Sequence, residues 1–243
     1  MKPYNREQTT KSEEVREMFN NIAPAYDRLN HILSLQIDRR WRYNVVRRVA
    51  KVLRSVEKPR ILDVATGTGD LALAMARRIT TADVVGVDPS EGMLAVAREK
   101  IERAGLSDRV SVDVQSAEEL RFDEEQFDVV TAAFGVRNFG DLAGGVAEMV
   151  RVTRCGGMVI ILEFSTPKNR LFRSIYNIYS RSVLPRIGAL ISRDRKAYDY
   201  LPASVEEFAS VEEFLELMRS TGLSDCRAVS QSGSIAQIYI GRK

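Results

Sequence analysis

The feature that most constrains the fold is a glycine turn at residues 63–70, which reads Asp-Val-Ala-Thr-Gly-Thr-Gly-Asp. An apolar pair precedes it and the apolar run 71–75 follows it. A strand, a glycine turn and a helix in this order form the first half of a parallel βαβ unit, in which a nucleotide-like ligand lies against bare backbone. Gly67 and Gly69 lack a Cβ, so the turn can adopt φ values that are closed to other residues.

A carboxylate on the next predicted strand completes the pattern of a cofactor site. Asp88 ends the apolar stretch 84–87, where a carboxylate can accept both hydroxyls of a ribose. The turn also fits the G-x-G-x-x-A form that binds NAD, but Asp63 would repel a pyrophosphate and attract the sulfonium and ammonium of S-adenosylmethionine (SAM). The sequence therefore favours SAM over NAD and predicts a cofactor site formed by Asp63, Thr66, Gly67, Thr68, Gly69 and Asp88.

Length and composition indicate one globular domain with no metal site. The 243 residues fit a single α/β domain with additions, and a net charge of +3 is too small to indicate nucleic acid by itself. Cys155 and Cys226 have neither metal-site nor disulfide spacing, and the chain has a single histidine. No segment approaches the roughly 18–20 apolar residues of a membrane span, and the N-terminus lacks an apolar signal region. We therefore expect a cytoplasmic protein with reduced cysteines.

Apolar runs alternate with amphipathic stretches, which is typical of a doubly wound sheet. We expect strands near 60–64, 83–87, 110–114, 127–133, 157–163, 223–230 and 234–241, and helices near 70–79, 90–104 and 141–154. The turn at 231–233 is too short for a helical crossover, so the last two strands must pair antiparallel. A seven-stranded, Rossmann-like α/β sheet with an antiparallel last strand is the arrangement of class I SAM-dependent methyltransferases. The glycine turn resembles their first motif, with Ala65 at the first glycine position.

Four segments divide this single predicted domain. A helical arm, 1–58, contains a helix near 11–20, an irregular stretch at 20–36 and a basic helix near 38–55. The cofactor-binding core, 59–165, follows it. An insertion between the fifth and sixth strands, 166–209, contains helical pieces at 169–182 and 186–192, and the segment 210–243 supplies a C-terminal helix and the antiparallel strands.

The arm carries a family resemblance. Residues 26–34, Tyr-Asp-Arg-Leu-Asn-His-Ile-Leu-Ser, and residues 38–42, Asp-Arg-Arg-Trp-Arg, resemble a signature of the ubiquinone/menaquinone biosynthesis C-methyltransferase family. Residues 134–138 and 151–165 also match. Members of that family methylate the ring of a polyprenylated quinol precursor, so the resemblance implies the same reaction class, with SAM as the cofactor.

The resemblance also implies roles for residues beyond the glycine turn. The loop after the third strand would hold adenine through Ser116 and Ala117. Methylation of a ring carbon requires a deprotonated hydroquinone, for which we expect Arg137 and Asn138 to stabilise the oxyanion and Tyr26 and Asp27 to orient or accept the proton. Each has a structural alternative: packing for Tyr26, a turn or cap for Asp27, and a surface salt bridge for Arg137. His31 is a further titrating candidate.

The predicted partners follow from a lipid substrate. The apolar, aromatic face at 171–184, with arginines beside it, is expected of a lid that guides the polyprenylated quinol from an anionic membrane surface, although a core helix or a homodimer contact would show the same pattern. We expect transient association with the inner face of the cytoplasmic membrane and no nucleic acid partner. The arm favours the menaquinone precursor, demethylmenaquinol, and leaves open the ubiquinone precursor and a non-catalytic SAM- or RNA-binding module.

Overall fold

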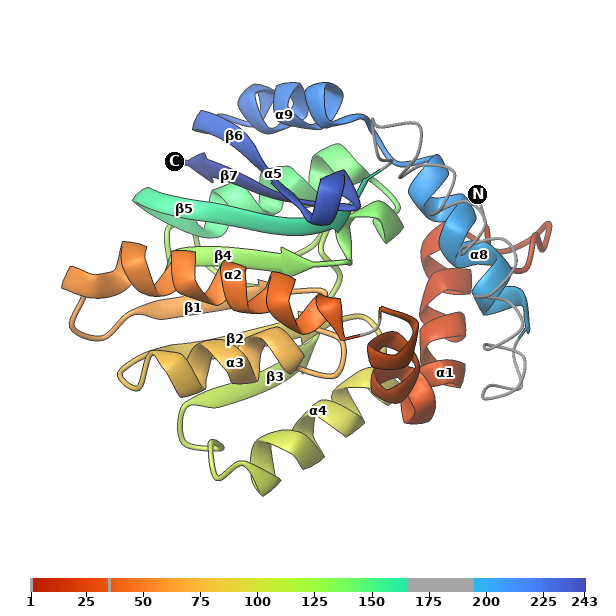
Figure 1. Ribbon diagram of the computed structural model, residues 1–243, viewed down its shortest axis with the longest axis horizontal. Helices are drawn as coiled ribbons and strands as arrows, with labels where there is room; N and C mark the ends of the chain where they lie inside the picture. Colours follow the sequence, from red (N-terminus) through yellow and green to blue (C-terminus); the bar gives the residue numbers. More distant parts are fainter. Residues whose placement is uncertain (1, 35, 166–194) are drawn as a thin grey trace.

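A seven-stranded sheet with strand order β3-β2-β1-β4-β5-β7-β6 forms the centre of the protein (Figure 1). The computed structural model describes residues 2–34, 36–165 and 195–243, with the side chains of 28–33, 195–199 and 201 outside that description. The strands are β1 (Arg60–Val64), β2 (Asp83–Asp88), β3 (Val110–Val114), β4 (Phe127–Ala133), β5 (Thr153–Phe164), β6 (Ser224–Gln231) and β7 (Ala236–Arg242). The helices are α1 (Lys11–Leu33), α2 (Ile37–Val52), α3 (Asp70–Arg78), α4 (Glu91–Arg103), α5 (Leu142–Val152), α8 (Arg195–Glu206) and α9 (Val211–Ser220), with short 3-10 turns η1 (Leu53–Ser55), η2 (Val136–Asn138) and η4 (Ser232–Ser234).

The strand directions confirm the predicted fold class. β1 pairs in parallel with β2 and β4, and β5 continues the parallel sheet beside β4. β7 runs antiparallel to both of its neighbours, β5 and β6, and the short turn η4 connects it to β6. This is the α/β class I SAM methyltransferase topology.

Helices cover both faces of the central strands, and consecutive strand residues point to opposite faces. Ile61 and Ile160 belong to a core cluster that includes α2 and α3, whereas Leu62 and Ile161 belong to a cluster that includes α5 and α9. All four side chains are fully buried. Near-continuous apolar strands are therefore required, and this explains why the central strands could be recognised in the sequence.

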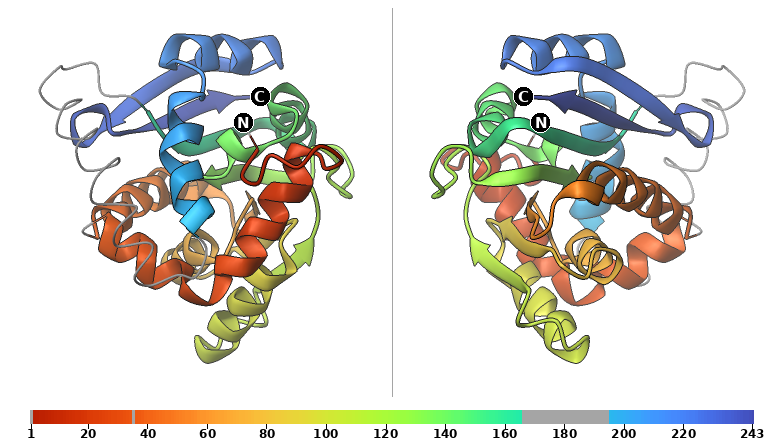
Figure 2. Two further views of the ribbon diagram at one scale, coloured as in Figure 1. Left: turned by 90° about the vertical axis from the view of Figure 1, so that its right-hand side faces the viewer. Right: turned by 90° about the vertical axis from the view of Figure 1, so that its left-hand side faces the viewer.

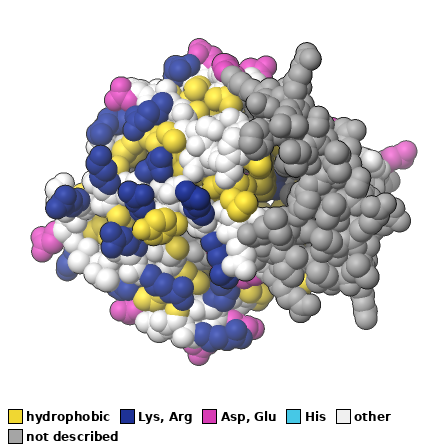
Figure 3. Space-filling view, viewed as in Figure 1, with side chains coloured by type: hydrophobic (Ala, Val, Ile, Leu, Met, Phe, Trp, Pro, Cys, Tyr) yellow, Lys and Arg dark blue, Asp and Glu magenta, His cyan; other side chains and the backbone are white. Residues whose placement is uncertain are grey.

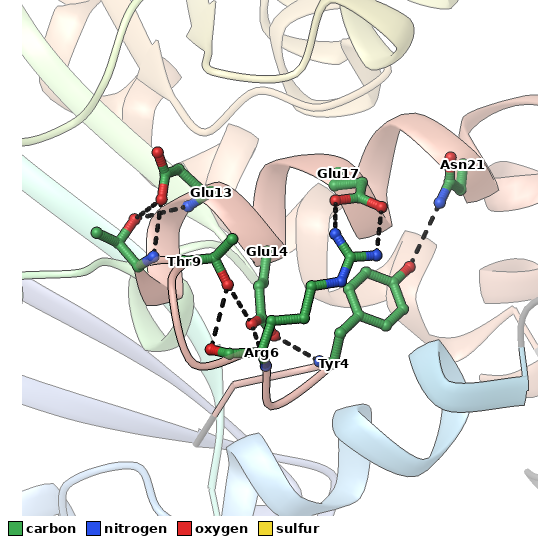
Figure 4. A network of polar contacts seen from close by, with 8 residues as sticks. Tyr4, Arg6, Thr9, Glu13, Glu14, Glu17 and Asn21 are labelled. Carbon is green, nitrogen blue, oxygen red and sulfur yellow. Dashed lines mark hydrogen bonds and ion pairs between the residues drawn. The ribbon is translucent and has the colours of Figure 1, made fainter.

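The segment before α1 is fixed to that helix by carboxylates (Figure 4). Glu14, which is buried, accepts the backbone N–H groups of Tyr4 and Arg6 at 2.6 and 2.8 Å, together with the hydroxyl of Thr9. The guanidinium of Arg6 also makes two hydrogen bonds to Glu17. These contacts hold the start of the chain against α1.

The arm contains the main departure from the predicted elements. The prediction of an irregular stretch at 20–36 is wrong for residues 20–33, because α1 is one helix that continues through Pro24 to Leu33. A proline inside a helix costs about 3 kcal/mol, so tertiary packing must offset that cost. Ile22 and Ala23 directly precede the proline and are buried in a cluster with Met93 of α4 and Tyr200 of α8.

α1 and α8 lie over the carboxyl edge of the parallel strands, where ligands bind in folds of this kind (Figures 1 and 2). α8 was not expected from the sequence, and the helical pieces predicted at 169–182 and 186–192 lie outside the described residues. Within the described part of the chain, no helix is long and apolar enough to cross a membrane.

Candidate active site

The glycine turn joins β1 to α3 at the carboxyl edge of the sheet. Gly67 has a φ of 57°, and a Cβ built on it would meet nothing within 4 Å, so its backbone faces open space. Gly69 caps α3 with a φ of 78°. Ala65 also has a positive φ, 52°, which glycine adopts without strain and alanine does not. Alanine at the first glycine position of the motif therefore adds backbone strain as well as a methyl group.

Two buried carboxylates lie at the carboxyl ends of β1 and its neighbour β2, beside this turn. Asp63 accepts the hydroxyls of Thr131 and Thr66 at 2.6 and 2.7 Å, and burial raises its pKa to about 6. Asp88 accepts the backbone N–H groups of Gly67 and Ser90, each at 2.9 Å, and burial raises its pKa to about 6 despite these bonds. Asp88 thus holds the glycine turn directly and retains acceptor capacity for hydroxyl donors.

The loop after β3 brings a third polar group to the same edge. The hydroxyl of Ser116 donates to the carboxylate of Glu118, which also accepts the backbone N–H of Gly140 at 2.7 Å. Ala117 is buried beside them. The loop is therefore attached to the segment after η2, on the other side of the site.

One cavity connects these segments. Of the predicted site residues, Tyr26, Gly67, Asp88, Ser116, Ala117 and Asn138 line it, and α1 closes one side with Ser12, Val15 and Phe19. Asp63, Thr66, Thr68, Gly69, Asp27 and Arg137 are not among the lining residues. The cavity thus joins the expected cofactor residues to Tyr26 and Asn138, two of the four residues expected to act on the substrate.

Arg137 lies behind the cavity in a buried ion pair. Its guanidinium donates to Glu163 of β5 at 2.8 Å, and the two side chains are 3% and 0% exposed. The same nitrogen donates to the carbonyl of Phe134, a cavity residue with a φ of 61°. A phenylalanine in this left-handed region is strained, so the ion pair holds an unfavourable backbone in place. The pair is buried, and thus differs from the surface salt bridge considered as an alternative.

α8 contributes two residues that sequence analysis missed. The hydroxyl of Tyr200 donates to the side-chain oxygen of Asn138 at 3.1 Å, and burial raises the pKa of Tyr200 to about 12, so the phenol is protonated at neutral pH. Ser204, one helical turn later, accepts from Arg137 Nε at 3.3 Å. Tyr200 and Ser204 are four residues apart and so lie on the same face of a helix. This spacing could have indicated the contact if α8 had been predicted.

Asp27 turns away from the cavity and toward the start of α3. Its carboxylate pairs with Lys100 of α4 at 2.7 Å and accepts the hydroxyl of Thr68. Lys100 also pairs with Asp70. Asp27 therefore connects the arm to the glycine turn, and its carboxylate is neutralised by a cation. The side chain of His31 lies outside the described residues.

Fold and site together define the class of protein. A class I methyltransferase sheet with an acidic residue near the end of β1, a glycine turn and a ribose-type carboxylate at the end of β2 fits SAM, and the open backbone at Gly67 leaves room for it. Solved structures with this fold include the [4+2]-cyclase SpnF, with a TM-score of 0.68, 20% identity and 97% of each chain covered. A SAM-dependent methyltransferase from Aquifex aeolicus has a TM-score of 0.59 and 18% identity, covering 81% of this chain and 88% of that one. These likenesses show the fold alone.

The chain belongs to the ubiE/COQ5 methyltransferase family, whose model matches residues 7–243. It is 49% identical to a ubiquinone/menaquinone biosynthesis C-methyltransferase UbiE from Geobacter sulfurreducens, over 97% of this chain and 90% of the relative. It is 41% identical to a demethylmenaquinone methyltransferase from Bacteroides fragilis, over 100% of this chain and 97% of the relative. The protein is thus a SAM-dependent C-methyltransferase of quinone biosynthesis, as the sequence resemblance implied.

With Asp88 as the expected ribose acceptor, SAM binding is predicted to depend on pH. Because burial raises its pKa from 3.8 to about 6, ribose hydroxyls meet the ionised acceptor only above about pH 6. Calorimetry should show SAM affinity rising between about pH 5 and pH 7, and Asp88→Asn should reduce that rise, with the remainder due to Asp63, whose pKa is also about 6. Folding stability should depend on pH in the opposite direction, because burial penalises the charged form of Asp88. The contribution of Asp88 to the free energy of unfolding is full below about pH 4 and is lost as pH rises through 6. Asp83→Asn, at the exposed start of β2, is the control.

Removal of the buried cation should destabilise the fold. Arg137→Ala leaves Glu163 buried without its partner, and we expect the free energy of unfolding in urea to fall by about 3–5 kcal/mol. Arg121→Ala breaks an exposed pair with Asp113 and should cost less than about 1 kcal/mol. Equal losses in the two variants would contradict the structural role of Arg137.

Tyr200 should influence turnover rather than cofactor binding. Tyr200→Phe removes the hydrogen bond to Asn138 and frees that amide to reorient, so we expect kcat to fall about tenfold, with the KM for SAM unchanged. The matched control is Tyr239→Phe, because the buried hydroxyl of Tyr239 has no hydrogen-bond partner within the described residues. If the KM for SAM rises by the same factor as kcat falls, Tyr200 of α8 affects SAM binding instead.

Proposed function

We propose that this chain methylates demethylmenaquinol to menaquinol, with SAM as the methyl donor. The observation that carries the proposal is the cavity that places Asp88, Gly67 and Ser116 beside Asn138 and Tyr26. The first group suits a nucleoside, and the second suits a phenolic ring. A ring hydroxyl and the methyl donor can therefore meet in one enclosed space.

The cofactor would be held mainly by groups at the strand ends. Asp88 accepts the ribose hydroxyls, and Ser116 with the backbone N–H of Ala117 holds the adenine. Asp63 supplies negative charge near the glycine turn, on the side of the sulfonium and ammonium. The hydroxyls of Thr66 and Thr68 donate to Asp63 and Asp27, so these threonines act by fixing the two carboxylates that border the turn.

The chemistry requires a phenolate. When a quinol hydroxyl loses its proton, the oxygen's electron pair delocalises to the adjacent ring carbon, and SAM supplies an electrophilic methyl group to that carbon. The carbon–methyl bond forms as the methyl–sulfur bond breaks, and loss of the ring proton then restores aromaticity. Asn138 donates its amide N–H to the phenolate oxygen, since its own oxygen is occupied by Tyr200. Tyr26 orients the reacting hydroxyl or accepts its proton, and Arg137 positions Asn138 through the ion pair with Glu163.

The names of the relatives support menaquinone. The relative from Bacteroides fragilis and a 42% identical one from Chlorobaculum tepidum are named demethylmenaquinone methyltransferase. The UbiE relative from Geobacter sulfurreducens is named for both ubiquinone and menaquinone. Menaquinone is the quinone common to all three names, and the arm at 26–34 also favours it.

The lipid tail would enter through the insertion, 166–209, which we propose as a substrate lid on a single domain. α8 is its described part and contacts Asn138 and Arg137. The apolar face at 171–184 lies outside the described residues, and its role in recruiting the tail is part of the proposal.

Substrate competition tests the proposal. Reduced demethylmenaquinol and the ubiquinone-pathway methoxy-benzoquinol, with equal prenyl tails in detergent, are incubated with methyl-labelled SAM, and the products are followed by mass spectrometry. We expect kcat/KM to be at least about tenfold higher for demethylmenaquinol, because a pocket that fits a naphthalene ring loses contacts with a single ring. Asp88→Ala controls for background transfer. A preference for the benzoquinol would assign the chain to the ubiquinone pathway.

A further inference from the structure

The outer face of α2 is basic and carries exposed apolar side chains. Ile37, Arg40, Tyr43, Arg47 and Lys51 recur at helical spacing on this face, opposite the buried side that includes Trp41 and Val45. Ile37 is 39% exposed and Tyr43 is 57% exposed, and they are two of the three large exposed hydrophobic residues in the described part of the chain. Figure 3 shows lysine and arginine gathered around apolar atoms on the side of the molecule that carries α2 in Figure 1.

A groove beside α2 extends this basic face onto the sheet. Its floor is apolar and comes from β5, β6 and β7, including Met158, Ile160, Val229 and Ile240. Its rim carries five cations and one acid, namely Arg47, Arg48, Lys51, Arg227, Arg242 and Asp225. We call the outer face of α2 (Ile37, Arg40, Tyr43, Arg47, Lys51) together with the groove cations Arg48, Arg227 and Arg242 the α2 surface.

Asp225 is the one acid on the groove rim, so the cations of the α2 surface are only slightly compensated within the described residues. Arg6, Arg98 and Arg137, elsewhere in the protein, have carboxylate partners, but no ion pair joins any cation of the α2 surface to a described acid. Burial and the neighbouring charges of Arg47 and Arg227 lower the pKa of Arg48. Like charges held this close raise the free energy of the isolated protein, and an anionic partner would relieve that cost.

We propose that the α2 surface docks the protein on an anionic phospholipid membrane. Lipid phosphates would occupy the cationic rim of the groove, while Tyr43 and Ile37 enter the boundary between headgroups and acyl chains, the depth at which amphipathic aromatic side chains partition. This inference rests on the proposed lipid substrate, and it names the surface by which the enzyme meets that substrate.

Other occupants fit the α2 surface less well. A second copy that used the same patch across a two-fold axis would place cations against cations. RNA would satisfy the charge, but exposed isoleucine and a floor of aliphatic strand residues provide no groups that read bases and only one exposed ring, Tyr43, for stacking. A membrane matches both the charge and the apolar component.

The N-terminal end of the α2 surface is close to the active site, whereas the groove lies at the other end of α2, where Arg242 pairs with Met158 near the start of β5. The buried side of α2 places Trp41 against Phe134, with ring centroids 6.1 Å apart, and the guanidinium of Arg42 lies 5.2 Å from the centre of the Phe134 ring. Phe134 lines the cavity. Docking that includes the N-terminal turns of α2 would therefore bring the site within one helix thickness of the lipid, a short path for a membrane-embedded substrate.

Vesicle cosedimentation of the full chain, without quinol, tests the proposal. Wild type should bind vesicles of phosphatidylcholine with phosphatidylglycerol at least tenfold more tightly than phosphatidylcholine alone, and rising salt should weaken that binding. Arg47→Gln with Arg227→Gln should weaken it by at least about tenfold, because each basic residue near such a surface contributes measurably. The control, Arg121→Gln with Arg219→Gln, removes two exposed arginines elsewhere and should stay within about twofold of wild type.

Three outcomes would overturn the proposal: equal binding to both vesicle types, equal loss in the groove and control variants, or salt-dependent binding of an oligoribonucleotide with no vesicle binding. Methylation of a detergent-dispersed, short-tailed quinol separates this proposal from the proposed function. The groove variant should retain that activity even when its vesicle binding is lost. If wild type lacks that activity, the proposed function is refuted, and the vesicle experiment still tests membrane binding independently.

Discussion

The buried ion pair between Arg137 and Glu163 organises the chemical half of the site. It connects β5 to the turn after β4 and, through Ser204, to α8. A buried charge pair is a weak source of net stability, because desolvation offsets much of the attraction. Its effect on geometry is larger. Arg137 is held in place next to Asn138 and donates to the carbonyl of Phe134. Three segments from distant parts of the sequence are thereby held around one cavity.

The cofactor half follows from the topology of the sheet. Asp63 and Asp88 come from neighbouring parallel strands, so their carboxylates reach the same edge. Asp88 accepts the backbone N–H of Gly67, so the carboxylate proposed to hold the ribose is tied directly to the glycine turn. The arm closes over both halves: Tyr26 reaches the cavity, while Asp27 pairs with Lys100 beside the glycine turn. Adjacent residues of α1 thus serve the two sides of the site.

The sheet could be predicted because strands buried on both faces are apolar runs and a three-residue turn forces antiparallel pairing. The long α1 could not, since Pro24 signals a break locally and only contacts with α4 and α8 compensate for it. The spacing of glycines and acids placed Asp88 and Gly67, but the burial of Arg137 depends on Glu163, which looks like an ordinary strand residue in the sequence. Asp27 illustrates the same limit, because its partner lies 73 residues away along the chain.

The proposed division into cofactor residues and quinol residues implies that SAM binding and methyl transfer can be affected separately by mutation. The most direct measurement is the single-turnover rate of methyl transfer in Asn138→Ala, together with its dissociation constant for SAM. If Asn138 stabilises the phenolate, the rate should fall about a hundredfold, as for loss of one oxyanion donor, while the dissociation constant stays within about threefold of wild type. A rate near wild type, or a parallel loss of SAM affinity, would contradict this division of the site.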